Sequence, residues 1–128
     1  MAEGLSKKEF WGGWIASALA SAMLLMSASF KLMRSKEVVE GFAKMGYPEG
    51  AILPIGLAEL ACVVLFLIPR TAVLGAAFSA AYLGGAVATH VKMSDSFLAP
   101  VLVGVVVWIG AWLRTPALRA VFPLVAKK

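Results

Sequence analysis

The chain has little charge, one cysteine and one histidine. Only 15% of its 128 residues are charged, whereas a soluble domain has about a quarter. Because Cys62 is alone, an intrachain disulfide is excluded, and a packed thiol is its expected role. One histidine with one intramembrane carboxylate falls short of a usual metal-ligand set, so no metal is expected. A glycine-rich phosphate loop is also missing, and no serine stands out as an activated nucleophile.

Apolar residues dominate instead, at 61% of the chain. A helix needs about 20 apolar residues to cross a bilayer, so four helices would use about 80 and leave little else. We therefore predict an all-α integral membrane four-helix bundle that forms one domain over residues 1–128, with the lipid bilayer around it. The expected spans are about 10–33, 50–68, 71–91 and 96–114.

The connections between these spans indicate how the bundle is built. Short connections favour antiparallel neighbours and an up-down-up-down order. The long first connection carries apolar residues at helical spacing, which predicts an interfacial helix over about 35–45 that Gly46-Tyr47-Pro48 ends. Thr71 is expected to cap the third span and Ser94, Asp95 or Ser96 the fourth, and Thr115-Pro116 is expected to begin a short tail helix.

Basic residues flank the apolar runs, and the net charge is +5. Lysine and arginine in such positions are topology signals, so nucleic acid is not an expected partner. Their excess on the side of the two termini predicts that both termini are cytoplasmic. Tryptophans near the same ends fit an interfacial belt, with quinone stacking as a second interpretation. They are Trp11, Trp14, Trp108 and Trp112.

Small residues recur every four positions in the third span, for example Ala76, Ala80, Gly84 and Ala88. Such faces let helix backbones approach closely in lipid. We expect packing within the chain, with a homo-oligomer as the other possibility.

Three ionisable residues lie inside or at the border of the spans: Lys31, Glu59 and His90. Burying such groups at membrane depth is costly, so each is expected to face the bundle interior and to have a partner or a function. Helix directions and the lean of side chains toward the helix N-terminus make the three converge. Polar neighbours that would line the same outward-facing pocket are Ser27, Arg34, Tyr47, Ser79, Tyr82, Thr89 and Asp95, although a helix cap is the favoured role of Asp95.

Three interpretations of this constellation stay open. The first is a structural clamp in which Lys31 and Glu59 pair and His90 forms a hydrogen bond nearby. The second is a pocket that binds a ligand. The third is a catalytic acid-base site in which Glu59 and His90 exchange protons with a substrate and Lys31 stabilises a developing oxyanion.

The order of these features resembles the DoxX-like family of small bacterial membrane proteins. The features are four short spans, Lys31 at the end of the first, Gly46-Tyr47-Pro48, Glu59, Pro69-Arg70, and His90 before Asp95. The resemblance implies a four-helix bundle in the bacterial cytoplasmic (inner) membrane. The namesake of the family is a subunit of a thiosulfate:quinone oxidoreductase, and other members are tied to oxidative-stress complexes. No universal catalytic motif comes with the family.

Two functions are therefore expected. The first is binding of a small amphiphilic or quinone-like molecule, or service as the membrane component of a redox system with a redox partner. The alternative is a cofactor-independent membrane enzyme, an isomerase, cyclase or epoxide-opening catalyst, that uses Glu59 and His90 as acid and base. No cofactor is required by either, although a quinone is possible in the first. A channel or proton path is a less favoured hypothesis, because the cytoplasmic halves of the spans lack ionisable groups.

Overall fold

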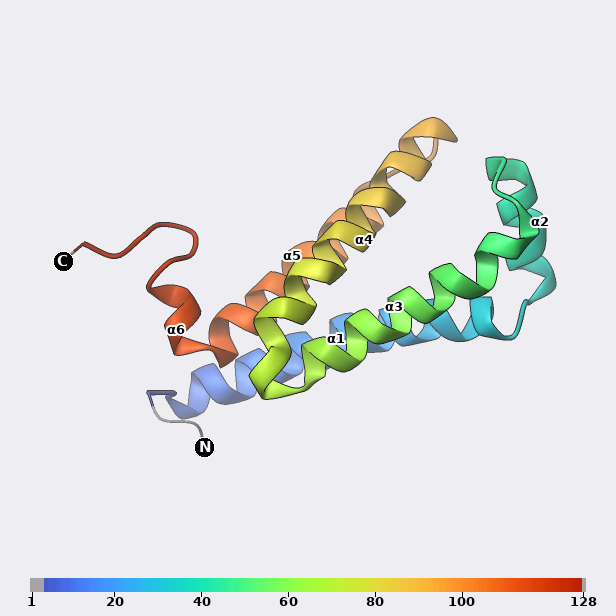
Figure 1. Cartoon of the computed structure of the whole chain (residues 1–128). Helices are drawn as coiled ribbons and strands as arrows, with labels where there is room; N and C mark the ends of the chain where they lie inside the picture. Colours follow the sequence, from blue (N-terminus) through green and yellow to red (C-terminus); the bar gives the residue numbers. More distant parts are fainter. Residues whose placement is uncertain (1–3, 128) are drawn as a thin grey trace.

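A computed structural model describes residues 4–127, which form helices joined by short connections and contain no strand (Figure 1). The all-α prediction is confirmed. The helices are α1 (Lys7–Leu32), α2 (Lys36–Met45), α3 (Ile52–Leu67), α4 (Ala72–Lys92), α5 (Leu98–Arg114) and α6 (Pro116–Arg119), and the 3-10 turns are η1 (Glu49–Ala51) and η2 (Pro69–Thr71).

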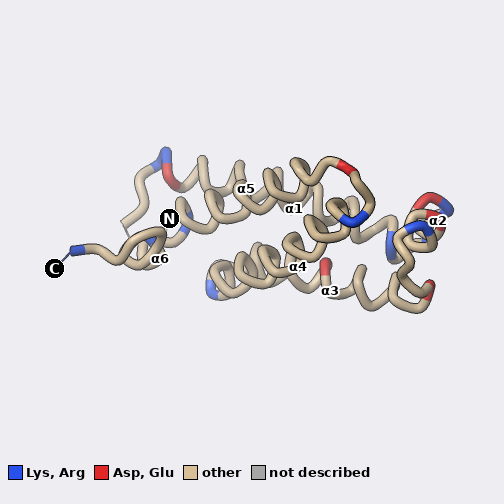
Figure 2. The backbone as a smooth tube through the Cα atoms, turned by 90° about the horizontal axis from the view of Figure 1, so that it is seen from above, with Lys and Arg blue, Asp and Glu red and all other residues tan. Residues whose placement is uncertain are grey.

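Three helical segments within residues 4–127 are long and apolar enough to cross a membrane: Lys7–Leu32, Glu49–Leu67 and Pro69–Lys92. The predicted fourth span corresponds to α5, which has 17 residues and is shorter than the other three. Charged residues gather mainly at the two ends of the bundle (Figure 2). Large apolar side chains such as Leu19 and Phe78 are exposed between those ends. This distribution is typical of a protein surrounded by lipid.

Each long helix packs against two neighbours in a closed ring: α1 contacts α3 and α5, and α4 contacts α3 and α5. We call the end that holds the start of α1, η2 and the end of α5 the N-terminal end, and the opposite end the α2 end. Toward the α2 end, α4 and α5 diverge from α1 and α3 (Figure 1).

The small residues of α4 follow this divergence. At the N-terminal end Gly75 touches the α3 backbone, because a Cβ there would lie 2.2 Å from the Phe66 nitrogen, and Ala76 is fully buried. Farther along, Gly84 and Ala88 are exposed, and a Cβ on Gly84 would meet nothing within 4 Å. The expected close approach therefore holds only for the first half of the stripe.

Two of the expected helix caps are wrong. The Thr71 hydroxyl donates to the Leu65 carbonyl at 2.7 Å and caps nothing in α4. Since the last carbonyls of α3 have no partner within that helix, they compete for this hydroxyl in the tight turn. The N-cap of α5 is Phe97, and Ser96 rather than Asp95 accepts from the first turn, through a 3.4 Å bond from the Leu98 nitrogen.

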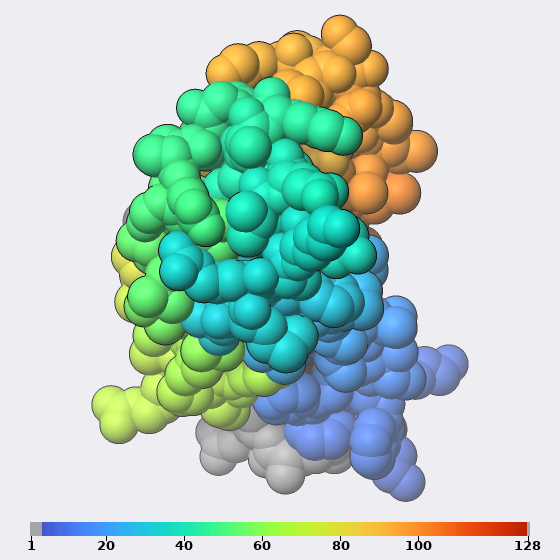
Figure 3. Space-filling view, turned by 90° about the vertical axis from the view of Figure 1, so that its right-hand side faces the viewer, coloured from blue at the N-terminus to red at the C-terminus, as the bar shows by residue number. Residues whose placement is uncertain are grey.

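Helix α2 confirms the predicted amphipathic segment. Ser35 caps its start and Gly46 ends it in the left-handed region at φ 81°. Phe42 is its buried side chain, and the charged residues lie on the other side. Viewed from the α2 end, this helix and the residues after it cover the middle of that face (Figure 3).

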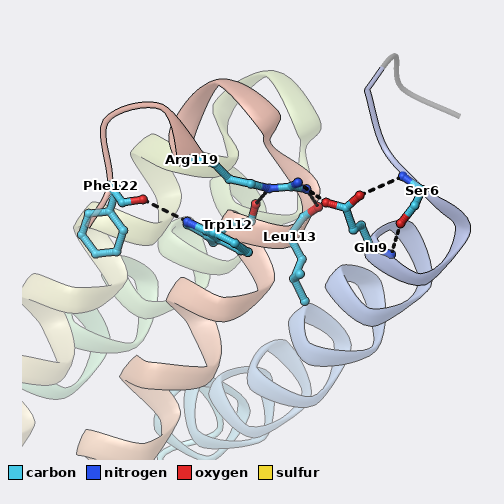
Figure 4. Close-up of polar contacts among 6 residues, drawn as sticks. All are labelled: Ser6, Glu9, Trp112, Leu113, Arg119 and Phe122. Carbon is cyan, nitrogen blue, oxygen red and sulfur yellow. Dashed lines mark hydrogen bonds and ion pairs between the residues drawn. The ribbon is translucent and has the colours of Figure 1, made fainter. Parts of the chain in front are cut away.

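The first turn of α1 is tied to the segment after α5 at the N-terminal end (Figure 4). Arg119 forms an ion pair with Glu9 and donates to the carbonyls of Trp112 and Leu113 at the end of α5. The tail helix starts at Pro116 as predicted but has only four residues. Its contacts satisfy carbonyls that the end of α5 would otherwise leave without donors.

Candidate functional site

A buried ion pair joins α1 to α3. The Lys31 ammonium lies 3.0 Å from Glu59 Oε1, and the Glu59 side chain is 2% exposed. Gly56, one turn before Glu59, allows this contact, because a Cβ there would lie 2.9 Å from the Lys31 Cβ. The missing side chain thus lets the two helices approach where the charges meet.

Ser27 completes a triangle with these two residues. Lys31 Nζ donates to Ser27 Oγ at 2.6 Å, and Ser27 Oγ donates to Glu59 Oε1 at 3.2 Å. Ser27 and Lys31 are one helical turn apart on α1, so they share a face. The hydroxyl proton of Ser27 is therefore donated to the Glu59 carboxylate, while the Ser27 oxygen accepts a hydrogen bond from the Lys31 ammonium.

Tyr82 brings a third helix, α4, to the cluster. The Lys31 ammonium lies 5.9 Å from the centre of the Tyr82 ring, within the range of a cation–π interaction. We call Ser27, Lys31, Glu59 and Tyr82 the charged cluster.

Two buried hydroxyls in the core have no hydrogen-bond partner among the described residues, those of Ser21 and Ser79. Ser79 is fully buried, and Ser21 is 3% exposed. Ser79 lies about one turn before Tyr82 on α4. An unsatisfied buried hydroxyl costs about 1 to 3 kcal/mol. A polar group that reached Ser21 or Ser79 would therefore gain a hydrogen bond that these two residues lack within the described chain.

At the α2 end, the segment after α2 contacts α4 through polar groups. Thr89 Oγ1 donates to the Gly85 carbonyl, so the Tyr47 hydroxyl is the donor in its 2.8 Å bond to Thr89. Lys92 donates to the Met45 carbonyl at 3.0 Å. Because Thr89 is two turns after Tyr82, the same face of α4 carries both groups of contacts.

Three further sequence-predicted residues take part neither in the charged cluster nor in the Tyr47–Thr89 contact. His90 Nδ1 is 2.7 Å from the Ala86 carbonyl of its own helix, and no described hydrogen bond or ion pair joins it to Glu59 or Lys31. Arg34 is exposed after α1 at φ 52°. Asp95 is exposed, and its backbone N–H donates to the His90 carbonyl. In residues 4–127 no group of three potential ligands is placed to hold a metal ion.

Arg114 is a residue whose environment the sequence did not indicate. Its position at the end of α5 predicts a charged residue that flanks a span and faces water. The structure instead leaves Arg114 only 8% exposed. Two glycines in the sequence could have indicated this burial. A Cβ on Gly13 would lie 2.6 Å from Arg114 Cγ, and a Cβ on Gly110 would lie 2.5 Å from Ser17 Oγ, which accepts from Arg114. Glycines of this kind on two facing helices make space for a large buried side chain.

A family model described as the DoxX-like family matches residues 15–113, a range that contains the whole charged cluster. No curated protein and no solved structure matches the chain significantly. The match covers most of the sequence and agrees with the apolar helical architecture. This membrane protein belongs to the DoxX-like family.

Proposed function

We propose that this protein is a four-span bundle of the bacterial cytoplasmic membrane that binds the polar group of a small amphiphilic, quinone-like molecule at the charged cluster. The observation that carries the proposal is Glu59, a buried carboxylate held by an ammonium and a hydroxyl from α1 beside a phenol ring from α4. Ionisable groups at such depth in membrane proteins usually serve a ligand, an ion path or a partner.

The donors of Lys31 support a carbonyl-bearing ligand. An ammonium has three N–H groups, and two of those of Lys31 are used by Ser27 and Glu59. A quinone carbonyl can accept the third, and Tyr82, whose ring lies beside the ammonium, carries a hydroxyl that can donate a further hydrogen bond. The apolar faces of the surrounding helices suit the rest of such a molecule.

The enzymatic alternative uses Glu59 and His90 as acid and base. His90 lies eight residues after Tyr82, about 12 Å farther along α4. Its Nδ1 donates to the Ala86 carbonyl, which leaves Nε2 of a neutral ring as the proton acceptor. A general acid and a general base must each lie within hydrogen-bond reach of the atom that they serve on the same small substrate. This separation favours binding over acid-base catalysis.

Removing the Lys31 charge tests the binding proposal. We expect wild-type protein purified in mild detergent to retain a quinone-like ligand that mass spectrometry detects in an organic extract. Lys31→Met should reduce the retained ligand, and the affinity for an added short-chain quinone, by about tenfold, because a charged hydrogen bond is lost. Lys36→Met changes an exposed lysine of α2 and is the matched control. No ligand in wild type together with no binding of the added quinone would refute the proposal.

The membrane orientation has its own prediction. In a Cys62→Ala background, a cysteine placed at Lys44 or Asp95 should react with an impermeant thiol reagent added outside intact cells. A cysteine at Lys127 should react only after lysis, because the basic side of the bundle is expected in the cytoplasm. The reverse labelling pattern would invert the orientation and move the charged cluster toward the cytoplasmic side.

A further inference from the structure

Arg114 is a buried cation that has no carboxylate partner within residues 4–127. Its Nη1 donates to Ser17 Oγ at 3.0 Å and its Nη2 to the Leu67 carbonyl at 3.4 Å, and both acceptors are neutral. The guanidinium carbon lies 4.0 Å from the centre of the Trp14 ring. A second ring, that of Phe66, has its centre 5.2 Å from the same carbon. A guanidinium stays charged and has five N–H donors, so the two aromatic rings offset only part of its charge and these hydrogen bonds use only two of its donors.

A pocket of about 410 Å³ opens beside this side chain at the N-terminal end. Its apolar walls include Leu5 and Trp14 near the start of the chain and Ala72 at the start of α4. Among the described residues that line it, Arg114 is the charged one, and Thr115 adds a hydroxyl. The volume lies within the range of small-ligand sites.

The start of α4 also favours an anion in this pocket. Ala72 is both a wall residue and the first residue of the 21-residue helix. No side chain caps that helix start. The Ala72 N–H itself donates to the Pro69 carbonyl of η2, so the helix contributes through the positive end of its dipole, which adds to the charge of Arg114.

We infer that this pocket binds the phosphate of an anionic phospholipid. A single guanidinium matches the single charge of a phosphodiester, and the apolar walls can contact the glycerol and first acyl carbons. Exposed Lys7, Lys8 and Arg70 belong to the same end of the bundle and would attract an anionic leaflet. The site is separate from the charged cluster, so it stands whether or not that cluster binds a ligand.

The test compares lipids that differ in net charge. Native mass spectrometry and thermal unfolding in detergent would follow titration with phosphatidylglycerol, phosphatidylcholine or inorganic phosphate. We expect phosphatidylglycerol to bind about tenfold more tightly than phosphatidylcholine and to raise the melting temperature, while inorganic phosphate has no effect. Arg114→Gln should abolish this preference, and Arg70→Gln, which changes an exposed arginine of η2, should keep it.

A second variant keeps the inference testable if Arg114→Gln does not fold. Leu5→Trp should fill the pocket while the hydrogen bonds of Arg114 stay in place, and it too should remove the preference. Equal binding of both lipids to wild type, or an unchanged preference in Leu5→Trp, would overturn the inference. An Arg114-dependent stabilisation by inorganic phosphate alone would instead assign the pocket to a free anion.

Discussion

Replacing Glu59 with alanine should lower the free energy of unfolding by about 3 to 5 kcal/mol, because the substitution leaves the Lys31 ammonium without its partner. The Lys31 side chain is 13% exposed, so water cannot fully replace the carboxylate. Glu59→Gln should cost less, since an amide oxygen can still accept from Ser27 and Lys31. Thermal and denaturant unfolding in detergent would measure both effects.

A double variant separates the structural role of this pair from its proposed binding role. Lys31→Met with Glu59→Leu removes both charges, so much of the lost stability should return. If the cluster binds a ligand, the stable double variant should still have lost the ligand. Glu49→Ala, which changes an exposed carboxylate of η1, is the control and should leave stability unchanged. A stable double variant that binds the ligand as wild type does would leave only the structural clamp.

Gly75→Ala should be comparably harmful, at about 3 kcal/mol or more. The new methyl group would lie 2.2 Å from the Phe66 nitrogen and 2.4 Å from its Cα, both atoms of the α3 backbone. Because a backbone cannot turn aside as a flexible side chain can, α3 and α4 must separate at the N-terminal end. The same unfolding measurements would detect the loss.

Gly84→Ala is the matched control on the same helix. A Cβ at Gly84 meets nothing within 4 Å, so the change should be neutral or stabilise α4 by up to about 1 kcal/mol through helix propensity. A large loss at Gly84 would mean that the exposed half of α4 is covered by another copy of the chain. Crosslinking in membranes would then identify that copy.

Much of the fold follows from local patterns. The extents of α1, α2 and α4 agree with the predicted ranges to within a few residues, because apolar run length and helical periodicity are properties of the segment itself. The caps at Thr71 and Asp95 failed for the opposite reason. A hydroxyl or carboxylate near a helix end has several possible partners, and the turn geometry decides which one is in reach.

The candidate site divides in the same way. The sequence pointed to Lys31 and Glu59 because charge within an apolar run is costly wherever the run packs. It could not decide that Ser27 and Tyr82 join the pair while His90 bonds to its own helix. Those contacts depend on how far each helix is rotated and shifted along its neighbours.

The sequence by itself determined a helical membrane protein of the DoxX-like family, since composition, run length and motif order do not depend on packing. Only the tertiary structure decided which helices touch, that α4 and α3 diverge toward the α2 end, and that Arg114 is buried without a carboxylate partner among residues 4–127. The physical reason is that a pair of helices is positioned by the shapes of both surfaces together. A glycine on one helix and a large side chain on the other fix the contact between two helices together. The position of the contact therefore cannot be predicted from either helix by itself.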